Sequence, residues 1–132
     1  MPLVRIDLRA GQTPARRQAI ADAVHQALVE TMNVPADDRF QVITEHGPET
    51  LIYDPNYAGI ARGTGFVGIQ IALRRGRTVT MKQALYRRVA ALLHDRAQVR
   101  PEDVFVSLVE NEPADWSFGN GVAQYATQHA SA

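Results

Sequence analysis

The strongest constraint on the fold is a sequence pattern that recurs at a constant offset of 65 residues, without a gap. Matching residues continue through a predicted strand, turn, helix, turn and second strand. The clearest pairs are Ile6 with Ile71, Leu8 with Leu73, Gly11 with Gly76, Thr13 with Thr78, Val24 with Val89, Leu28 with Leu93, Asp38 with Asp103, Phe40 with Phe105, and Glu45 with Glu110. Such a register predicts an internal duplication.

Each repeat has the pattern of a strand, a helix and a second strand. Residues 3–8 alternate between apolar and polar, which is typical of a half-buried strand. Thr13 and Pro14 fit the N-cap and first position of a helix, whose apolar stripe at positions 20, 24, 28 and 32 ends near Asn33. Residues 39–45 then read as the second strand.

Two such units predict an α+β fold in a single domain, 1–132. Strand–helix–strand crossovers place their strands parallel and are right-handed. The simplest assembly is one four-stranded mixed sheet with both helices on one face. We place the repeat units at about 1–45 and 66–110, followed by a C-terminal extension, 111–132, in which residues 124–132 read as a short strand or arm and then a loose end.

The second face of this sheet also has apolar residues, so we expect it to be covered, most simply by other subunits. The residues expected on it are Leu3, Ile43, Phe66, Ala72, Val104, Val106 and Leu108.

Composition narrows the possible classes of function. Fourteen basic residues balance fourteen acidic ones, which argues against nucleic acid or an anionic membrane as a partner. The absence of cysteine excludes disulfides and thiolate catalysis. The four histidines lack metal-ligand spacing, and Gly63-Thr64-Gly65 precedes a strand rather than opening a helix, so neither a metal nor an organic cofactor is expected. With no export signal or membrane-length apolar run, the expected location is cytoplasmic.

The differences between the two units predict where a site lies. Pro2 corresponds to Val67 in the second unit, whereas Arg77 corresponds to Gln12 and Arg75 to Ala10. If the first strands of the two units pair antiparallel, the start of one lies beside the end of the other. Pro2 would then meet the arginines that follow the third strand, and each chain would have one site.

The chemistry of these residues is coherent. Removal of Met1 would make Pro2 a secondary amine, which can attack a carbonyl group to form an iminium ion or act as a general acid. Burial and nearby arginines would both lower the pKa of this amine. Guanidinium groups bind carboxylates in two-point geometry, so a small anionic carbonyl compound is the expected substrate.

The chain resembles the tautomerase superfamily and, within it, the malonate semialdehyde decarboxylases, over nearly its whole length. The segments that carry this resemblance are Met1-Pro2-Leu3, Val34-Pro35-Ala36-Asp37-Asp38-Arg39-Phe40-Gln41, and Val109-Glu110-Asn111 leading into Asp115-Trp116-Ser117-Phe118-Gly119. The resemblance implies the fold of macrophage migration inhibitory factor, assembly as a homotrimer, and catalysis by an amino-terminal proline.

It also implies roles for individual residues. Pro2 would be the catalytic amine, and Asp38 would activate water or assist proton transfer. Arg74 would bind the substrate carboxylate together with Arg77, which we favour, or Arg75. Two aromatic residues, Trp116 and Phe118, would form a wall of the pocket.

These observations predict a cofactor-independent decarboxylase of malonate semialdehyde or a similar 3-oxo acid, with a possible hydratase side activity. One alternative is a keto–enol tautomerase of the phenylpyruvate type, in which Pro2 is a general base and Asp38 is dispensable. The other is a trimeric binding protein that lacks catalysis.

Overall fold

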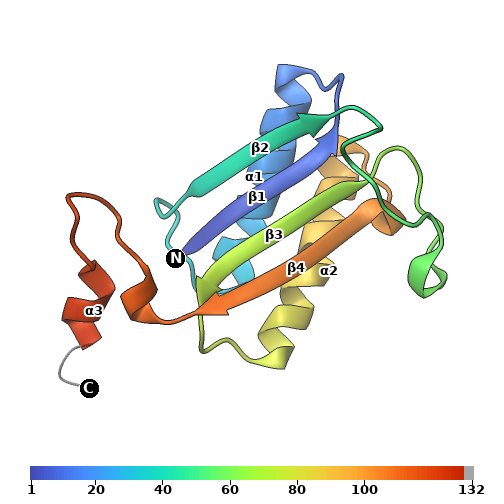
Figure 1. Ribbon diagram of the computed structural model, residues 1–132. Helices are drawn as coiled ribbons and strands as arrows, with labels where there is room; N and C mark the ends of the chain where they lie inside the picture. Colours follow the sequence, from blue (N-terminus) through green and yellow to red (C-terminus); the bar gives the residue numbers. More distant parts are fainter. Residues whose placement is uncertain (130–132) are drawn as a thin grey trace.

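The computed structural model describes residues 1–129 and forms a sheet covered on one face by two long helices (Figure 1). The strands are β1 (Pro2–Arg9), β2 (Phe40–His46), β3 (Val67–Arg74) and β4 (Val104–Asn111). The helices are α1 (Pro14–Thr31), α2 (Val79–Ala97) and the short α3 (Gln124–His129). Three single-turn 3₁₀ helices complete the fold: η1 (Tyr57–Gly59), η2 (Pro101–Asp103) and η3 (Pro113–Asp115).

The four strands follow the order β2-β1-β3-β4. β1 is parallel to β2, and β3 is parallel to β4, whereas the two central strands β1 and β3 are antiparallel. Each parallel pair is connected through one of the long helices, α1 or α2. The predicted α+β fold, with its mixed four-stranded sheet, is confirmed.

Both long helices begin at a threonine. The side chain of Thr13 accepts a hydrogen bond from the backbone N–H of Arg16 at 3.1 Å, and Thr78 accepts one from Met81 at 3.2 Å. Such N-caps satisfy a backbone donor at the start of a helix and typically contribute about 1 kcal/mol. The predicted cap at Thr13, with Pro14 as the first helical residue, is confirmed.

The core lies between the sheet and the two helices. Every second residue of β1 and β3 is buried, as are the stripe residues of α1. The buried set includes Val4, Ile6, Leu8, Ile20, Val24, Leu28, Met32, Ile69, Ile71 and Leu73. This alternation leaves the other face of the same strands without a helix.

The prediction for this uncovered face, called the outer face below, was partly wrong. Ile43 pairs with Ile6, and Val104, Val106 and Leu108 pair with buried residues of β3, so these four side chains pack against the helix-side core. β4 has apolar residues at both alternating sets of positions, so its sequence alone does not fix which set faces the helices. Its register with β3 decides the question.

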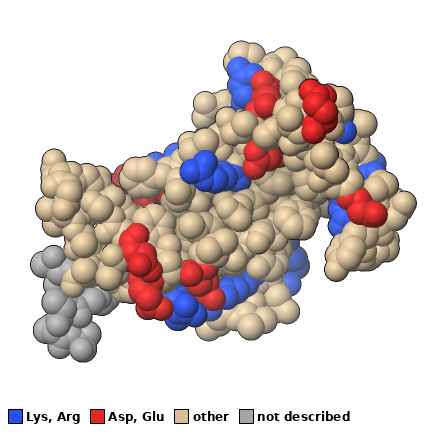
Figure 2. All heavy atoms as spheres, viewed as in Figure 1, with Lys and Arg blue, Asp and Glu red and all other residues tan. Residues whose placement is uncertain are grey.

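The outer face instead carries Phe40 and Val42 of β2 and Phe105 and Val109 of β4, which are 40–50% exposed. Leu3 and Ala72 lie between them on β1 and β3. Figure 2, viewed as in Figure 1, shows this face as broad uncharged areas interrupted by a few charged side chains.

The C-terminal segment also differs from its prediction. Residues 124–129 form the helix α3, not a strand or arm, and residues 130–132 lie outside the described part of the chain. The backbone reverses immediately before α3, where Gly119, Asn120 and Gly121 all have positive φ. The tight turn at Asn120 places α3 beside η3.

Candidate active site

The start of β1 lies between the start of β2 and the end of β3. Leu3 pairs with Phe40 of β2, and Pro2 pairs with Leu73 of β3. Pro2 is buried. The antiparallel pairing of β1 and β3 therefore brings the amino terminus next to Arg74, as the sequence predicted.

Asp38 is the nearest acidic partner described for the amino terminus. Its Oδ2 lies 3.4 Å from the Met1 nitrogen, and its side chain is only 9% exposed. Its other oxygen, Oδ1, is buried and has no hydrogen-bond partner among the described residues. Since buried polar atoms are normally paired, this oxygen remains available for a water or substrate group.

The electrostatic surroundings disfavour a charged amine. Burial lowers the pKa of the Met1 α-amino group below its ordinary value, an effect that Asp38 opposes. Arg77 and Arg74 act in the same direction as burial, because their positive charges repel the ammonium form. One amine thus interacts with an acid and two guanidinium groups at the same end of the sheet.

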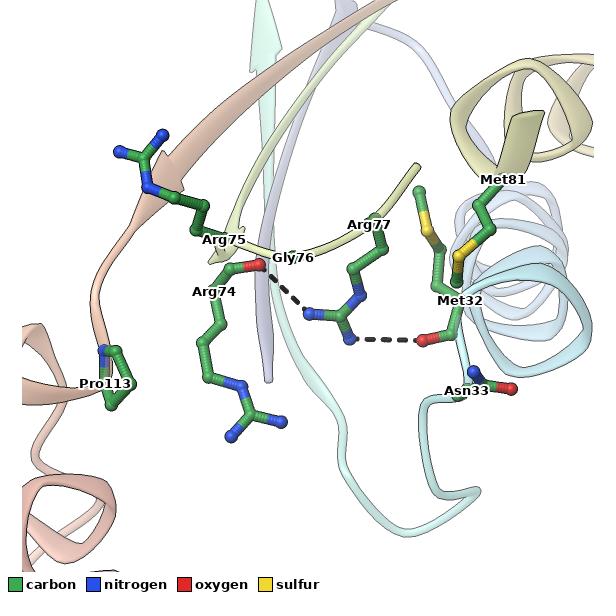
Figure 3. Close-up of a pocket in the computed structure, with 8 residues that line it drawn as sticks. All are labelled: Met32, Asn33, Arg74, Arg75, Gly76, Arg77, Met81 and Pro113. Carbon is green, nitrogen blue, oxygen red and sulfur yellow. Dashed lines mark hydrogen bonds between the residues drawn. The ribbon is translucent and has the colours of Figure 1, made fainter. Parts of the chain in front are cut away.

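Arg77 is held rigidly by backbone carbonyls (Figure 3). Its two terminal nitrogens donate hydrogen bonds to the carbonyl oxygens of Arg74 and Met32, each at 3.1 Å. Burial lowers the pKa of the Arg77 guanidinium, and the charge of Arg74 lowers it further. A partly desolvated cation with fixed orientation favours the binding of an anion.

Arg74 lies beside Arg77 and beneath an aromatic ring. Its guanidinium carbon is 4.5 Å from the centroid of the Tyr125 ring, which is cation–π geometry. Both arginines border a cavity of about 410 Å³. The cavity is also lined by Met32, Asn33, Arg75, Gly76, Met81 and Pro113.

Arg75 differs from its two neighbours. It pairs with Glu112 at 2.8 Å, and the two side chains are 62% and 59% exposed. Figure 3 shows its side chain pointing in the opposite direction from Arg74. The structure therefore brings Arg77, rather than Arg75, into the electrostatic neighbourhood of the amine.

Trp116 and Phe118 lie on the outer face and do not line the arginine cavity. With Leu3, Phe40 and Ala72 they border a separate cavity of about 410 Å³. The Trp116 indole donates to the Asn111 side chain at 2.7 Å, and its ring stacks on Phe118 with centroids 5.8 Å apart.

Tyr125 links these aromatic residues to the arginines, and the sequence interpretation missed it. Its ring meets that of Phe118 edge-on at 4.9 Å while also covering Arg74. The 65-residue offset could not identify Tyr125, because the extension after β4 lies outside the repeat. The only available signal was a further aromatic residue that follows the glycine-flanked turn at Asn120.

The described residues contain no group of three or more His, Asp or Glu side chains placed to hold a metal ion. Within the same part of the chain, no helix has the length and apolar character needed to cross a membrane.

Two relatives from Bacillus subtilis (strain 168) are similar over almost their full length. Probable tautomerase YusQ is 43% identical over 124 residues, which cover 94% of this chain and 98% of the relative. Probable tautomerase YrdN is 35% identical over 127 residues, which cover 96% and 98% respectively.

Solved structures show the same fold. A malonate semialdehyde decarboxylase is 35% identical with a TM-score of 0.89, covering 96% of this chain and 98% of the other. FG41 malonate semialdehyde decarboxylase, inhibited by 3-bromopropiolate, is 42% identical with a TM-score of 0.89 and covers 98% of each. A fused 4-OT, described as a symmetric trimer, is 26% identical with a TM-score of 0.76 and covers 94% and 98%.

A family model described as a tautomerase enzyme matches residues 38–119, and a second model with that description matches residues 2–60. Together these ranges include Pro2, Asp38 and all three arginines. The chain belongs to the tautomerase family of enzymes.

Proposed function

We propose that this protein is an amino-terminal-proline enzyme that decarboxylates malonate semialdehyde or a similar 3-oxo acid. The observation that carries the proposal is the meeting of the buried amino terminus with Asp38, Arg74 and Arg77 at one end of the sheet. Similarity to two malonate semialdehyde decarboxylases, at 35% and 42% identity, supports the choice of reaction.

Arg74 and Arg77 bind the substrate carboxylate. Arg77 is oriented by two carbonyl groups, and Arg74 is restrained by Tyr125. Two guanidinium groups hold the carboxylate so that the bond to be broken can align with the carbonyl system, which is catalysis by orientation. Arg75, engaged with Glu112, remains a reserve candidate.

Pro2 supplies the amine after Met1 is removed. Its nitrogen attacks the aldehyde carbon, water leaves, and a positively charged iminium forms. The electron pair of the breaking carbon–carbon bond moves toward the iminium nitrogen as carbon dioxide departs. Protonation of the resulting enamine and hydrolysis release acetaldehyde and restore the amine. Alternatively, protonated Pro2 polarises the carbonyl oxygen as a general acid without a covalent intermediate.

Asp38 transfers protons and activates water in this scheme. It lies beside the terminal amine, and its Oδ1 has no partner among the described residues. As a carboxylate it can accept a proton from a water that adds to the iminium or to an unsaturated oxo acid. The second use would give the hydratase side activity.

We further propose that the enzyme is a homotrimer with its outer face at the subunit contacts. Half-exposed Phe40 and Phe105 occupy this face, and burying apolar surface of this kind favours association. The symmetric trimer described for the fused 4-OT supports this assembly. Trp116 and Phe118 would then wall a pocket completed by a neighbouring subunit.

The second candidate is a keto–enol tautomerase, favoured by the names of both Bacillus subtilis relatives. Pro2 would then move a proton between carbon and oxygen as a general base. This reaction breaks no carbon–carbon bond and has no need of the water-activating role of Asp38.

One set of assays separates the two. Protein shown by mass to lack Met1 is assayed with malonate semialdehyde and with phenylpyruvate, as wild type, Pro2→Ala and Asp38→Asn. The decarboxylase proposal expects acetaldehyde from the first substrate and a large loss in both variants. Phenylpyruvate turnover that survives Asp38→Asn supports the tautomerase. Unchanged turnover of both substrates in Pro2→Ala would exclude catalysis by the proline.

A further inference from the structure

A second arginine cavity lies at the other end of β1, where the segment between β2 and β3 supplies most of its lining. It measures about 360 Å³ and is lined by Arg9, Arg62 and Thr64 together with apolar residues that include Leu51, Ile52 and Tyr53. The active-site residues Pro2, Asp38, Arg74 and Arg77 are absent from its lining.

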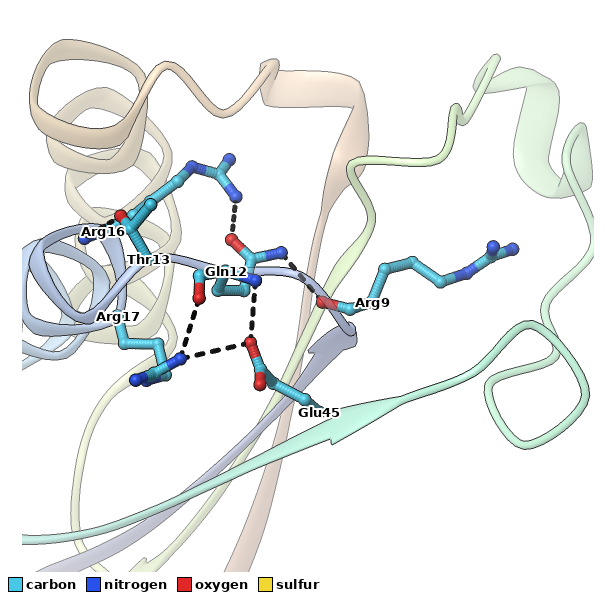
Figure 4. A network of polar contacts seen from close by, with 6 residues as sticks. All are labelled: Arg9, Gln12, Thr13, Arg16, Arg17 and Glu45. Carbon is cyan, nitrogen blue, oxygen red and sulfur yellow. Dashed lines mark hydrogen bonds and ion pairs between the residues drawn. The ribbon is translucent and has the colours of Figure 1, made fainter.

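Arg9, the last residue of β1, lacks a partner for its buried donor. Its Nε is buried and has no hydrogen-bond partner, and its side chain forms no ion pair within residues 1–129. Figure 4 shows the side chain extending away from the polar cluster around Gln12 and Glu45. A buried donor left unpaired is costly, more so when it is charged, so an anion bound at the terminal nitrogens of Arg9, which are not among the buried unpaired atoms, would offset part of this cost.

Three of the neighbouring carboxylates are already engaged. Asp7 pairs with His46 at 2.6 Å, and Glu45 accepts from the Gln12 backbone at 2.9 Å. Asp103 accepts from the Gly63 backbone at 2.7 Å. Among the described lining residues there is no Asp or Glu, so the cavity presents positive charge beside apolar walls.

Arg9 also corresponds to an arginine of the candidate active site. Arg9 ends β1 as Arg74 ends β3, with the same 65-residue offset. The Gln12 side chain donates to the carbonyl of Arg9 at 2.8 Å, as Arg77 does to the carbonyl of Arg74. Tyr53 also lines the Arg9 cavity, although its ring stacks on Phe66 at 4.2 Å, whereas the Tyr125 ring covers Arg74.

What the second cavity lacks is the amine. Val67 stands where the first unit has Pro2, and it continues from Phe66 without a chain end. Arg62 is the second cation of this cavity, as Arg77 is in the active-site cavity. Its Nη1 already donates a hydrogen bond to the carbonyl of Tyr57 at 2.9 Å. The arrangement can therefore bind an anion but offers no nucleophile of the Pro2 kind.

We propose that this cavity, called the Arg9 site, binds a small monocarboxylate with a short apolar group, without transforming it. The carboxylate pairs with the Arg9 guanidinium, and the apolar group lies against Leu51, Ile52 and Tyr53. The proposal does not depend on the reaction catalysed at Pro2, because it uses different residues at the opposite end of the sheet.

The test uses butyrate, an unreactive carboxylate, and backbone ¹H–¹⁵N spectra of the assembled full-length protein. Two separate sets of resonances should shift on titration: Ile52 and Gly63 at the Arg9 site, and Asn33 and Gly76 at the active-site cavity. Arg9→Gln should weaken the first response by roughly tenfold or more and leave the second unchanged. Arg74→Gln should do the reverse.

Arg5→Gln is the matched control, because Arg5 is exposed on β1 and lines neither cavity. Arg9→Lys keeps the charge and should give an intermediate affinity, which covers the case in which Arg9→Gln fails to fold. Absence of shifts at Ile52 and Gly63 in the wild type, or wild-type affinity in Arg9→Gln, would overturn the proposal. Inorganic phosphate binding there as tightly as butyrate would overturn the assignment to carboxylates.

Discussion

Asp38 and Asp103 occupy corresponding positions in the two halves of the molecule but bind different partners. Asp38 lies 3.4 Å from the amine that begins the chain. Asp103 is 3% exposed and accepts a hydrogen bond from the backbone N–H of Gly63, which belongs to the segment entering β3. The same carboxylate position thus contacts the α-amino group in one half and a backbone peptide group in the other.

The remaining differences follow the same division. The first half contributes the amine and Asp38, whereas the second contributes Arg74 and Arg77, and only one end of the sheet has all of them. Strands β1 and β3 nevertheless have identical burial patterns, and Thr13 and Thr78 cap their helices in the same way. The two halves therefore differ at the candidate catalytic residues, whereas the features that build the core match. The internal duplication of the chain stays a prediction, and these matched features support it.

The largest effect on activity is expected when Pro2 is replaced by valine, the residue at the corresponding position 67 of the second half. Pro2→Val, with Met1 removed, replaces the secondary amine by a primary one in a buried strand position that Val67 shows to be compatible with valine. We expect kcat/KM for malonate semialdehyde to fall by about two to four orders of magnitude. Steady-state kinetics measures the loss, and an unchanged thermal midpoint shows that the fold is kept.

If Pro2→Val kept full activity, a secondary amine would not be needed for catalysis. The difference between Pro2 and Val67 would then not explain why the site lies at only one end of the sheet. Arg5→Lys is a suitable control for an altered β1, since Arg5 is exposed and lines neither the arginine cavity nor the aromatic cavity.

The arginines offer a second exchange between the halves, Arg77→Gln, which installs the residue found at Gln12. It removes a partly buried cation beside the amine, so kcat/KM should fall by roughly 10- to 100-fold, mainly through KM if the carboxylate is bound equally in ground and transition states. Arg75→Gln is the matched control and should change kcat/KM by less than about threefold, because that side chain is exposed. Equal losses in both variants would contradict the assignment.

The order and type of the main strands and helices could be predicted from the sequence because they depend on local patterns that occur in both halves. Alternation in β1, the apolar stripe of α1 and the Thr-Pro start each have a short-range physical cause, and all three were confirmed. The face of β4 was not predictable, since apolar residues at both alternating positions make the choice depend on pairing with β3. The helix α3 was missed because a segment of six residues has too few turns to show periodicity.

The site could be predicted in outline for the same reason. Antiparallel pairing of the central strands is enough to bring Pro2 near Arg74. The choice between Arg75 and Arg77 depends instead on which carbonyl groups lie within reach, a tertiary property that spacing does not encode. Tyr125 approaches Arg74 only because the chain reverses at Gly119 to Gly121.

A third test compares stability rather than activity. Asp103→Ala leaves the partly buried N–H of Gly63 without its acceptor, so the free energy of unfolding should fall by about 1–3 kcal/mol. Asp38→Asn should change it less, because the polar side chain is kept and only the ion pair with the amine is lost. Urea unfolding at constant protein concentration measures both. A larger destabilisation in Asp38→Asn would mean that its carboxylate is mainly structural.

The smallest effect is a shift in protonation. In protein that retains Met1, the pKa of the α-amino group should lie below its ordinary value, because burial disfavours the cation and Arg77 and Arg74 repel it. Asp38→Asn should lower this pKa further, since Asp38 is the group that opposes the shift, whereas Arg77→Gln should raise it. The pH dependence of α-amine acylation, followed by mass spectrometry, gives the three values.

The same shift has a consequence for stability. The unfolded chain keeps its proton up to an α-amino pKa of about 8, whereas the folded chain releases it at a lower pH. Between these two pKa values the unfolded state binds more protons, so this group makes stability rise with pH through that window. Asp38→Asn extends the window downward by lowering the folded-state pKa. Acetylation of the α-amino group should abolish this pH dependence, which assigns it to that amine. If stability instead fell as pH rose through the window, the ion pair with Asp38 would outweigh the effects of burial and of the arginines on the pKa.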